Sequence, residues 1–126
     1  ESKFVTSQPD NIDYYAMETG FTWNTQDRES DIKAAEKTWQ HAARMLQDQN
    51  LKLVLIDELT YMLSYGYLDK QTIVDAVMAR PQDQTVIITG RDACEELLAI
   101  ADTVSEVQPT KHAFDAGIKA QKGIDW

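Results

Sequence analysis

The sequence predicts an α/β fold, a mostly parallel sheet flanked by helices in three layers. Two short apolar runs rich in branched residues, at 51–56 and 85–89, are typical of strands that are buried on both faces. Helical patterns alternate with these runs, and that alternation requires crossover connections and hence parallel strands. With 126 residues, the chain is predicted to form one domain, 1–126, with a single hydrophobic core.

The composition argues against several classes of protein. The net charge of −9, without any local basic patch, is unfavourable for binding a nucleic-acid backbone. We find no signal peptide and no apolar segment near the roughly 20 residues that span a bilayer. Cys94 is the only cysteine, so no internal disulfide and no cysteine cluster is expected, and a cytoplasmic setting is favoured. The chain starts with Glu1 rather than Met, which is consistent with a start inside a longer protein.

The first third of the chain is expected to hold a strand, a loop and a helix. The segment Ile12–Met17 is β-prone and is predicted to be a short strand. A loop with two aromatic residues follows at 19–25. A helix then runs to about Gln47, with Ser30 or Asp31 as its N-cap. Its apolar positions recur with the helical period and predict one buried face: Ile32, Ala35, Trp39, Ala42, Ala43 and Leu46.

The middle of the chain is expected to be helical after the strand at 51–56. One or two helical turns are predicted within 60–67. A clearer helix is predicted over Asp69–Ala79, and Pro81 prevents its continuation. The inner side of that helix is formed by apolar residues at helical spacing: Ile73, Val74, Val77 and Met78.

The remaining elements are a strand, a helix and a last strand. Thr85–Thr89 is predicted to be a second buried strand. Asp92 is predicted to cap the helix that follows, and its apolar positions are Ala93, Leu97, Leu98 and Ala101. Thr103–Val107 is predicted to be a short strand that ends before Pro109. The tail from Lys111 shows no periodicity.

Four segments follow predicted strands and should lie along one edge of the sheet: Gly20-Phe21, Asp57-Glu58, Gly90-Arg91 and Pro109–Lys111. Open α/β sheets bind their ligands at this carboxyl edge. The convergence of these segments therefore predicts a ligand site there.

Asp57 and Glu58 end the central apolar run, and two interpretations of them are open. Two carboxylates at the end of a buried strand are costly unless a cation or hydrogen-bond donors meet them. Nucleotide-binding proteins use such a pattern to hold Mg²⁺ beside phosphates. The alternative is that the two acids only cap the next helix, since acidic residues are favoured in a first turn.

Arg91 and the aromatic loop also allow two interpretations each. A guanidinium directly after Gly90 suits a phosphate or a carboxylate, but Arg91 could equally pair with Asp92, Glu95 or Glu58. Phe21 and Trp23 could tuck into the nearest core, as most such aromatics do. Their functional interpretation is a flat apolar surface for a planar ligand.

Several segments together resemble the ATP:corrinoid adenosyltransferases of the bacterial cobalamin pathway. They are Met17–Trp23, Leu55–Tyr61, Val86–Arg91 and Lys111–Gly117, followed by Ala120-Gln121 and Gly123-Ile124-Asp125. The likeness extends from about Asn11 to Trp126. A strand that ends in Asp-Glu is unspecific by itself, whereas the segments in this order and spacing are highly specific.

The resemblance implies a P-loop-type fold and a cytoplasmic, homodimeric enzyme that depends on Mg²⁺ or Mn²⁺. The family transfers the 5′-deoxyadenosyl group of ATP to Co(I) of a corrinoid (cobalamin, cobinamide or cobyrinic acid a,c-diamide) and releases triphosphate. This reaction serves the biosynthesis and salvage of adenosylcobalamin. The resemblance also implies an electron-donating partner such as a flavoprotein reductase.

For the reaction that the resemblance implies, we predict roles for a few residues. Asp57 and Glu58 are expected to serve the metal and the departing triphosphate, and Arg91 to contact the triphosphate. Phe21 and Trp23 are expected to form a wall against one corrin face, which would exclude axial ligands and ease reduction of Co(II). Arg28 is a candidate for a corrin amide or a phosphate.

One departure from the family pattern is the phosphate loop. Gly20 and Gly66 lack the neighbouring Lys and Ser/Thr that cradle phosphates. We therefore expect the chain to be the C-terminal two-thirds of the enzyme, without the N-terminal strand and phosphate loop, and to bind ATP poorly alone. The alternatives are a non-catalytic corrinoid- or partner-binding module and a generic P-loop ATPase or kinase.

Overall fold

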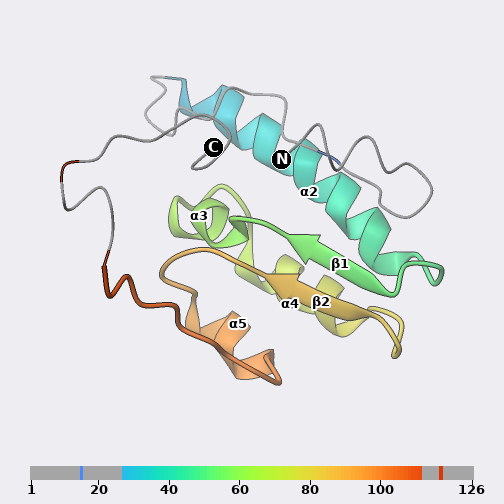
Figure 1. The fold of residues 1–126 in the computed structure, drawn as a ribbon. Helices are drawn as coiled ribbons and strands as arrows, with labels where there is room; N and C mark the ends of the chain where they lie inside the picture. The colour runs from blue at the N-terminus through green and yellow to red at the C-terminus, as the bar shows by residue number, and fades with distance from the viewer. Residues whose placement is uncertain (1–14, 16–26, 112–116, 118–126) are drawn as a thin grey trace. The chain divides into compact units, whose positions relative to one another are not determined.

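The computed structural model describes Tyr15, residues 27–111 and Gly117. Its elements, in chain order, are α2 (Arg28–Gln47), β1 (Leu53–Ile56), α3 (Leu59–Ser64), α4 (Lys70–Met78), β2 (Thr85–Ile88) and α5 (Glu95–Ile100), as Figure 1 shows. The chain divides into two units, 16–104 and 1–15 with 105–126, and all of these elements belong to the first. The expected strand at 12–17 lies outside the described residues, apart from Tyr15.

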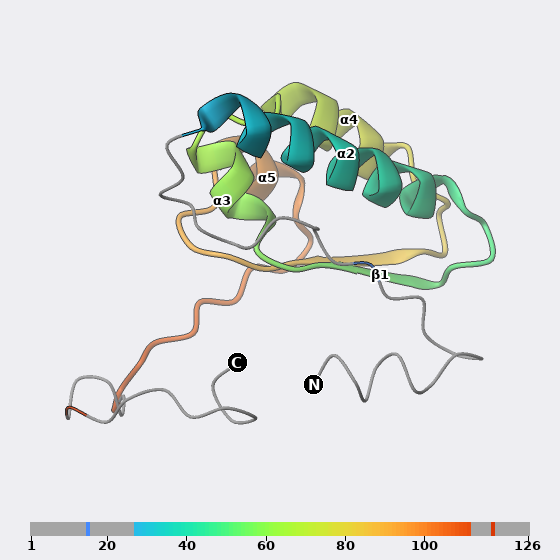
Figure 2. The same cartoon turned by 90° about the horizontal axis from the view of Figure 1, so that it is seen from above.

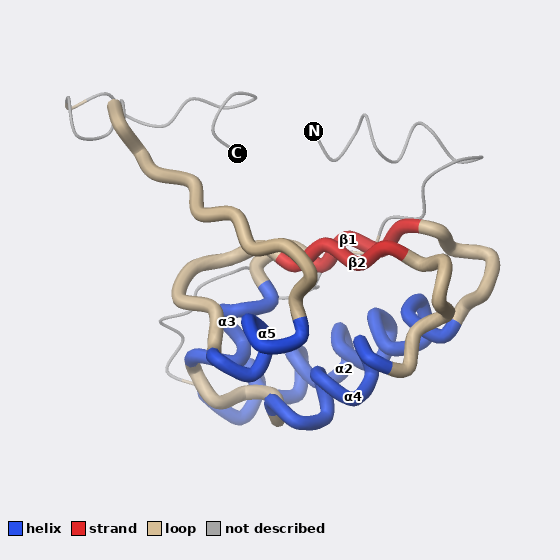
Figure 3. Tube along the Cα trace, turned by 90° about the horizontal axis from the view of Figure 1, so that it is seen from below, coloured by secondary structure: helices blue, strands red, loops and turns tan. Residues whose placement is uncertain are grey.

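The two strands form a parallel pair, as the alternation of strands and helices predicts. Leu53 lies opposite Thr85, and Ile56 lies opposite Ile88. The chain between the strands carries α3 and α4, so the connection is a helical crossover. Figures 2 and 3 show the described helices on one side of this sheet. The α/β class is thus confirmed as a small parallel sheet with helices packed against it.

The prediction that the central strand is buried on both faces is wrong within the described part of the chain. Val54 is 1% exposed, but its neighbours Leu53 and Leu55 are 57% and 59% exposed. On β2, Ile87 is 45% exposed. The reason is that the described helices cover a single face, which restores the alternation of a half-buried strand. The three-layer arrangement stays a prediction.

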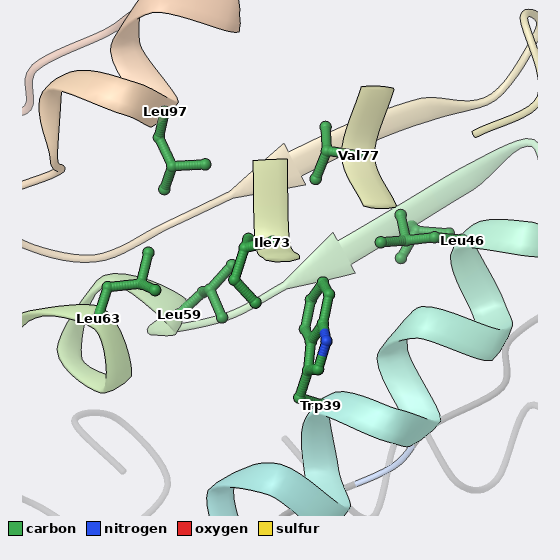
Figure 4. Close-up of a cluster of buried hydrophobic side chains, with 8 residues drawn as sticks. Trp39, Leu46, Leu59, Leu63, Ile73, Val77 and Leu97 are labelled. Atoms are coloured by element: carbon green, nitrogen blue, oxygen red, sulfur yellow. The ribbon is translucent and has the colours of Figure 1, made fainter. Parts of the chain in front are cut away.

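The core lies between this covered face and the helices. Figure 4 shows side chains from α2, α3, α4 and α5 directed toward one another: Trp39, Leu46, Leu59, Leu63, Ile73, Val77 and Leu97. The predicted apolar face of α2 is confirmed, because Ala35, Trp39 and Leu46 are buried and Ala42 and Ala43 pack against the core. A buried Asp31 on the same helix was not predicted.

The helix starts differ from the predictions at α2 but not at α4. Asp27, rather than Ser30 or Asp31, is the N-cap of α2, and its Oδ1 accepts a hydrogen bond from the Ser30 amide at 3.1 Å. Several capping residue types lie in succession here, and only the backbone path decides between them. Asp69 caps α4 as expected, and its Oδ2 accepts hydrogen bonds from the Thr72 amide and hydroxyl.

Two expectations after β2 are wrong. Cys94, rather than Asp92, is the N-cap of α5, because Asp92 adopts a left-handed conformation (φ 53°) while an N-cap is usually extended. Residues 103–107 form no strand, and Val104 and Val107 are 60% and 92% exposed. Two residues three apart cannot share one face of a strand, so this pair could not anchor the segment to a core.

The amino end of the sheet is fastened by polar contacts. Gln84 is 2% exposed, and its Nε2 donates to the backbone oxygens of Met45, Asp48 and Leu51 at 3.1–3.3 Å. Lys52 and Asp83 form an ion pair at 2.5 Å on the surface. These contacts tie the end of α2 to the start of both strands. Within the described residues, no helix is both long and apolar enough to traverse a bilayer.

Candidate functional site at the carboxyl end of the sheet

The carboxyl end of the sheet brings two of the four expected segments together. Asp57 and Glu58 directly follow β1, and Thr89, Gly90 and Arg91 directly follow β2. The pair Gly20-Phe21 lies outside the described residues. Residues 109–111 follow no strand and belong to the other unit, so the structure gives no support for their place at this edge.

A threonine hydroxyl links the two strand ends. Thr89 Oγ1 donates to Asp57 Oδ1 at 2.5 Å and accepts a hydrogen bond from the Glu58 amide at 3.1 Å. The Thr89 amide donates to the Ile56 oxygen at 3.2 Å, which continues the ladder of the sheet by one step. The first acidic residue and the backbone of the second are therefore both held by one side chain of the neighbouring strand.

Glu58 sits in a strained turn. Its backbone is left-handed (φ 61°, ψ 23°), a conformation that costs a non-glycine residue about 1–2 kcal/mol. It occupies the N-cap position of α3, yet its side chain makes no capping hydrogen bond. Its Oε2 is buried without a hydrogen-bond partner among the described residues. The interpretation of Glu58 as a simple helix cap is thus not supported by its side-chain contacts.

At Gly90 the turn after β2 lies very close to the start of α3. Its φ of +144° is a backbone conformation that favours glycine. A Cβ added there would lie 1.8 Å from Thr60 Oγ1 and 2.8 Å from Thr60 Cβ. Thr60 is itself buried, and its Oγ1 has no hydrogen-bond partner in the described structure. The absence of a side chain at Gly90 is therefore what allows the turn after β2 to approach the start of α3.

Arg91 is exposed at this edge, next to Gly90. Within the described residues it forms no ion pair with Asp92, Glu95 or Glu58, which was the alternative to ligand contact. Its guanidinium is accessible to an anionic ligand at the carboxyl end of β2. The ligand role of Arg91 stays a prediction.

Arg28, by contrast, is engaged with the protein. Its Nη2 donates to the Tyr65 backbone oxygen at 2.7 Å, and its guanidinium carbon lies 4.9 Å from the centre of the Tyr67 ring. These contacts fasten the start of α2 to the turn after α3. The predicted corrin or phosphate contact of Arg28 is untested. Phe21 and Trp23 lie outside the described residues, so their expected place beside Asp57 and Glu58 is untested too.

The acid pair fits a magnesium ion that is shared with a substrate. No group of three or more potential metal-ligating side chains (His, Cys, Asp or Glu) occurs among the residues that the structure describes. Mg²⁺ beside phosphates needs only one or two carboxylates, the other ligands being waters and phosphate oxygens. The exposed Asp57 and the unpartnered Oε2 of Glu58 match that smaller requirement.

A small apolar pocket lies beside Asp57. It has a volume of about 40 Å³, and its walls include Trp39, Ala42 and Met62. Pockets that enclose small-molecule ligands usually measure about 300–1,000 Å³. This pocket is therefore too small to enclose a nucleotide or a corrin ring.

Thr89 is a site residue that the sequence alone did not bring forward. It was predicted only as the last residue of a strand. The signal that could have found it is the strand register. Ile56 lies opposite Ile88, so the next residues, Asp57 and Thr89, lie opposite each other as well.

Comparison with known proteins confirms the resemblance to the ATP:corrinoid adenosyltransferases. The family model for the ATP:corrinoid adenosyltransferases BtuR/CobO/CobP matches residues 1–126. The corrinoid adenosyltransferase of Escherichia coli K12 is 56% identical over 119 residues, which cover 94% of this chain and 61% of that protein.

Two further relatives show the same pattern of coverage. The corrinoid adenosyltransferase CobA of Salmonella typhimurium is 54% identical over 119 residues, which cover 94% of this chain and 61% of the relative. The corrinoid adenosyltransferase of Pseudomonas aeruginosa is 45% identical over 126 residues, which cover 100% of this chain and 62% of the relative. The chain thus spans about three-fifths of the length of these curated relatives.

Proposed function

Since this chain belongs to the family of ATP:corrinoid adenosyltransferases, we propose that its protein transfers the 5′-deoxyadenosyl group of ATP to a corrinoid. The observation that carries the proposal is the family match over residues 1–126, with relatives up to 56% identical. The corrinoid substrate is cobalamin, cobinamide or cobyrinic acid a,c-diamide. The product serves the biosynthesis and salvage of adenosylcobalamin.

The proposed reaction is a displacement at carbon. The Co(I) corrinoid supplies the electron pair that forms the cobalt–carbon bond, and the bond between the 5′ carbon and the triphosphate oxygen breaks. Triphosphate leaves with that electron pair. Because the nucleophile is the corrinoid substrate, no protein base is needed, and the protein's task is positioning and charge neutralisation.

The acid pair is proposed to hold Mg²⁺ or Mn²⁺ beside the triphosphate. When bound, the ion would neutralise the charge of the leaving group. Glu58 offers a buried carboxylate oxygen that has no partner among the described residues, and the exposed Asp57 lies next to it. Arg91 is proposed to contact the triphosphate from the end of β2, and Arg28 is proposed to contact a corrin amide or a phosphate.

Phe21 and Trp23 are proposed to form an apolar wall against one face of the corrin. Such a wall would exclude axial ligands from Co(II) and make its reduction easier. We expect Phe21→Ala or Trp23→Ala to lose much more activity with a Co(II) corrinoid than with a prereduced Co(I) corrinoid. Equal losses with both substrates would assign the two aromatic residues to packing.

Four further features complete the proposal. They are a P-loop-type fold of the whole protein, a homodimeric assembly, a cytoplasmic location and an electron-donating flavoprotein as partner. The family relationship supports each of them as an expectation. Size-exclusion chromatography with light scattering tests the dimer. Reduction of the Co(II) corrinoid by a candidate flavoprotein under anaerobic conditions tests the partner.

The decisive experiment follows the absorption spectrum of a corrinoid mixed with the complete gene product. With prereduced corrinoid and MgATP, we expect conversion to the adenosylated form and one triphosphate released per turnover. Release of phosphate without any corrinoid would favour a generic ATPase. Corrinoid binding without conversion would favour a non-catalytic binding module.

The acid pair is tested by Glu58→Gln in the same protein. Removing the negative charge should lower the turnover at least about 100-fold, in line with the loss of a group that stabilises developing charge. Corrinoid binding should stay near normal. Glu36→Gln, at an exposed position of α2, is the matched control and should retain full turnover. Unchanged turnover of Glu58→Gln would contradict the assignment.

A further inference from the structure

The hydroxyl of Thr89 makes two hydrogen bonds, one as acceptor and one as donor. A hydroxyl carries one proton, and it can accept hydrogen bonds on its lone pairs. Here it accepts the bond from the Glu58 amide at 3.1 Å, and its own proton goes to Asp57 Oδ1 at 2.5 Å. Thr89 therefore holds the Asp57 side chain and the left-handed turn of Glu58 at once.

The Thr89 side chain is held in place by the backbone on both sides of it. On one side, Ile88 is the last residue of the parallel ladder, and the Thr89 amide donates to the Ile56 oxygen. On the other side, Gly90 lies so close to Thr60 that no side chain fits between them. The hydroxyl thus occupies a position that the fold defines, which a positioning group requires.

The same contacts divide the oxygens of the acid pair into two kinds. Asp57 Oδ1 is occupied by the Thr89 hydroxyl. The Oδ2 of Asp57 and the Oε2 of Glu58 have no protein hydrogen bond within the described structure. A ligand cation at this edge would therefore meet oxygens whose orientation is set from the neighbouring strand.

We propose that Thr89 is a positioning residue for the metal site, which orients Asp57 and Glu58 so that one oxygen of each faces the cation. The inference rests on the proposed function, since that function is what places a metal–triphosphate group at this edge. Thr89 acts through the two acidic residues and does not itself touch the metal. Loss of such an orienting partner typically weakens metal affinity about 10- to 100-fold.

The test compares three variants of the complete gene product. Thr89→Val keeps the branched shape but removes the hydroxyl, and Thr89→Ser keeps the hydroxyl but removes the methyl group. Thr85→Val is the matched control, because Thr85 is an exposed threonine on β2, the strand that Thr89 directly follows. Binding of Mn²⁺ to the protein is measured by the loss of the free-ion signal in electron paramagnetic resonance, without added triphosphate, because triphosphate would itself bind the ion. The metal dependence of turnover is measured in parallel.

We expect Thr89→Val to bind Mn²⁺ about 10-fold more weakly or worse. It should also need proportionally more metal for half-maximal turnover, with a smaller change in kcat at saturating metal. Thr89→Ser and Thr85→Val should stay within about threefold of the parent. Circular dichroism checks that each variant is folded, and Thr89→Ala replaces Thr89→Val if that variant does not fold.

Two results would overturn the proposal. One is unchanged Mn²⁺ affinity in a folded Thr89→Val or Thr89→Ala. The other is a 10-fold loss in a folded Thr89→Ser, because the hydroxyl is then not the group that matters. If the parent protein itself forms no adenosylated corrinoid, the proposed function fails. If the parent is active but the variants bind Mn²⁺ as tightly as it does, only the role of Thr89 fails.

Discussion

The two ends of the parallel sheet are built differently. At the amino end, Gln84 is nearly inaccessible and donates to three backbone oxygens, while Lys52 and Asp83 form an ion pair. At the carboxyl end, Glu58 and Asp92 adopt left-handed conformations, and Glu58 and Thr60 each bury an oxygen that lacks a partner in the described structure.

The difference indicates where the molecule stabilises its fold and where it tolerates strain. Strained backbone and unpaired buried oxygens persist only when the surroundings enforce them, and in proteins they cluster at functional sites. One partial exception exists at the amino end, where Gln84 Oε1 is also buried without a partner. Changes at the amino end should therefore affect mainly the free energy of unfolding, and changes at the carboxyl end should affect ligand binding as well.

The largest loss of stability is expected from Gln84→Glu. The substitution places a carboxylate where an amide group now donates to the oxygens of Met45, Asp48 and Leu51, so a buried charge faces three acceptors. We expect the free energy of unfolding at pH 7 to fall by about 3 kcal/mol or more. Urea denaturation measures it, and the loss should shrink at lower pH as the new carboxyl group becomes protonated.

Lys52→Ala is the control for this end of the sheet. The Lys52 side chain is 65% exposed, and exposed ion pairs contribute little to stability. We expect a change below about 1 kcal/mol. A folded Gln84→Glu that keeps its stability but loses turnover would break the distinction between the two ends.

Gly90→Ala should produce the next largest effect. The added Cβ would collide with Thr60 in a backbone conformation that disfavours side chains, so we expect a loss of about 2–4 kcal/mol in the free energy of unfolding. Gly66→Ala is the matched control. It also has a left-handed φ (71°), but the nearest atom is 3.6 Å away, so about 1–2 kcal/mol is expected.

The clash itself can be isolated in a double-mutant cycle. Thr60→Ala removes the hydroxyl that the Gly90→Ala methyl group would meet. We expect a favourable coupling of at least about 0.5 kcal/mol between the two substitutions. Equal stability of Gly90→Ala and Gly66→Ala would show that the close approach of the turn after β2 to the start of α3 is not what requires glycine.

The smallest effect concerns Asp69, the N-cap of α4. Hydrogen bonds from the hydroxyl and the amide of Thr72 lower the pKa of the Asp69 carboxyl below its usual value of 3.8. A carboxyl group with a lowered pKa stabilises the folded state above pH 3.8, and its contribution is lost as the pH falls through the folded-state pKa. Asp69→Ala should therefore reduce the melting temperature slightly at pH 7, and the difference from the parent should diminish below pH 3.8.

Some features of the two ends could be predicted from the sequence and others could not. Both strands and the long helix were predictable, because hydrophobic periodicity is a property of neighbouring residues, as Val54 and the buried face of α2 show. The Asp-Glu pair at the end of β1 was predictable as well, since its composition alone suggests a metal. Its function as a metal site is still a proposal.

The remaining features depend on residues that are distant in the chain. Nothing near Thr89 in the sequence indicates that its hydroxyl contacts Asp57, and nothing near Gly90 indicates that Thr60 excludes a side chain there. The exposure of Leu53 and Leu55 depends on which segments cover the sheet, which local patterns do not specify. Phe21 and Trp23 lie outside the described residues.

The parallel register has a consequence for how the chain is synthesised. Each ladder bond between β1 and β2 joins residues separated by all of α3 and α4, so β1 can find no partner in β2 until the ribosome has added roughly 30 more residues. At about 5–20 residues per second, this waiting time lasts a few seconds. Until then Leu53–Ile56 lacks its β2 partner, and the backbone groups on that side of the strand stay open to pairing with other chains.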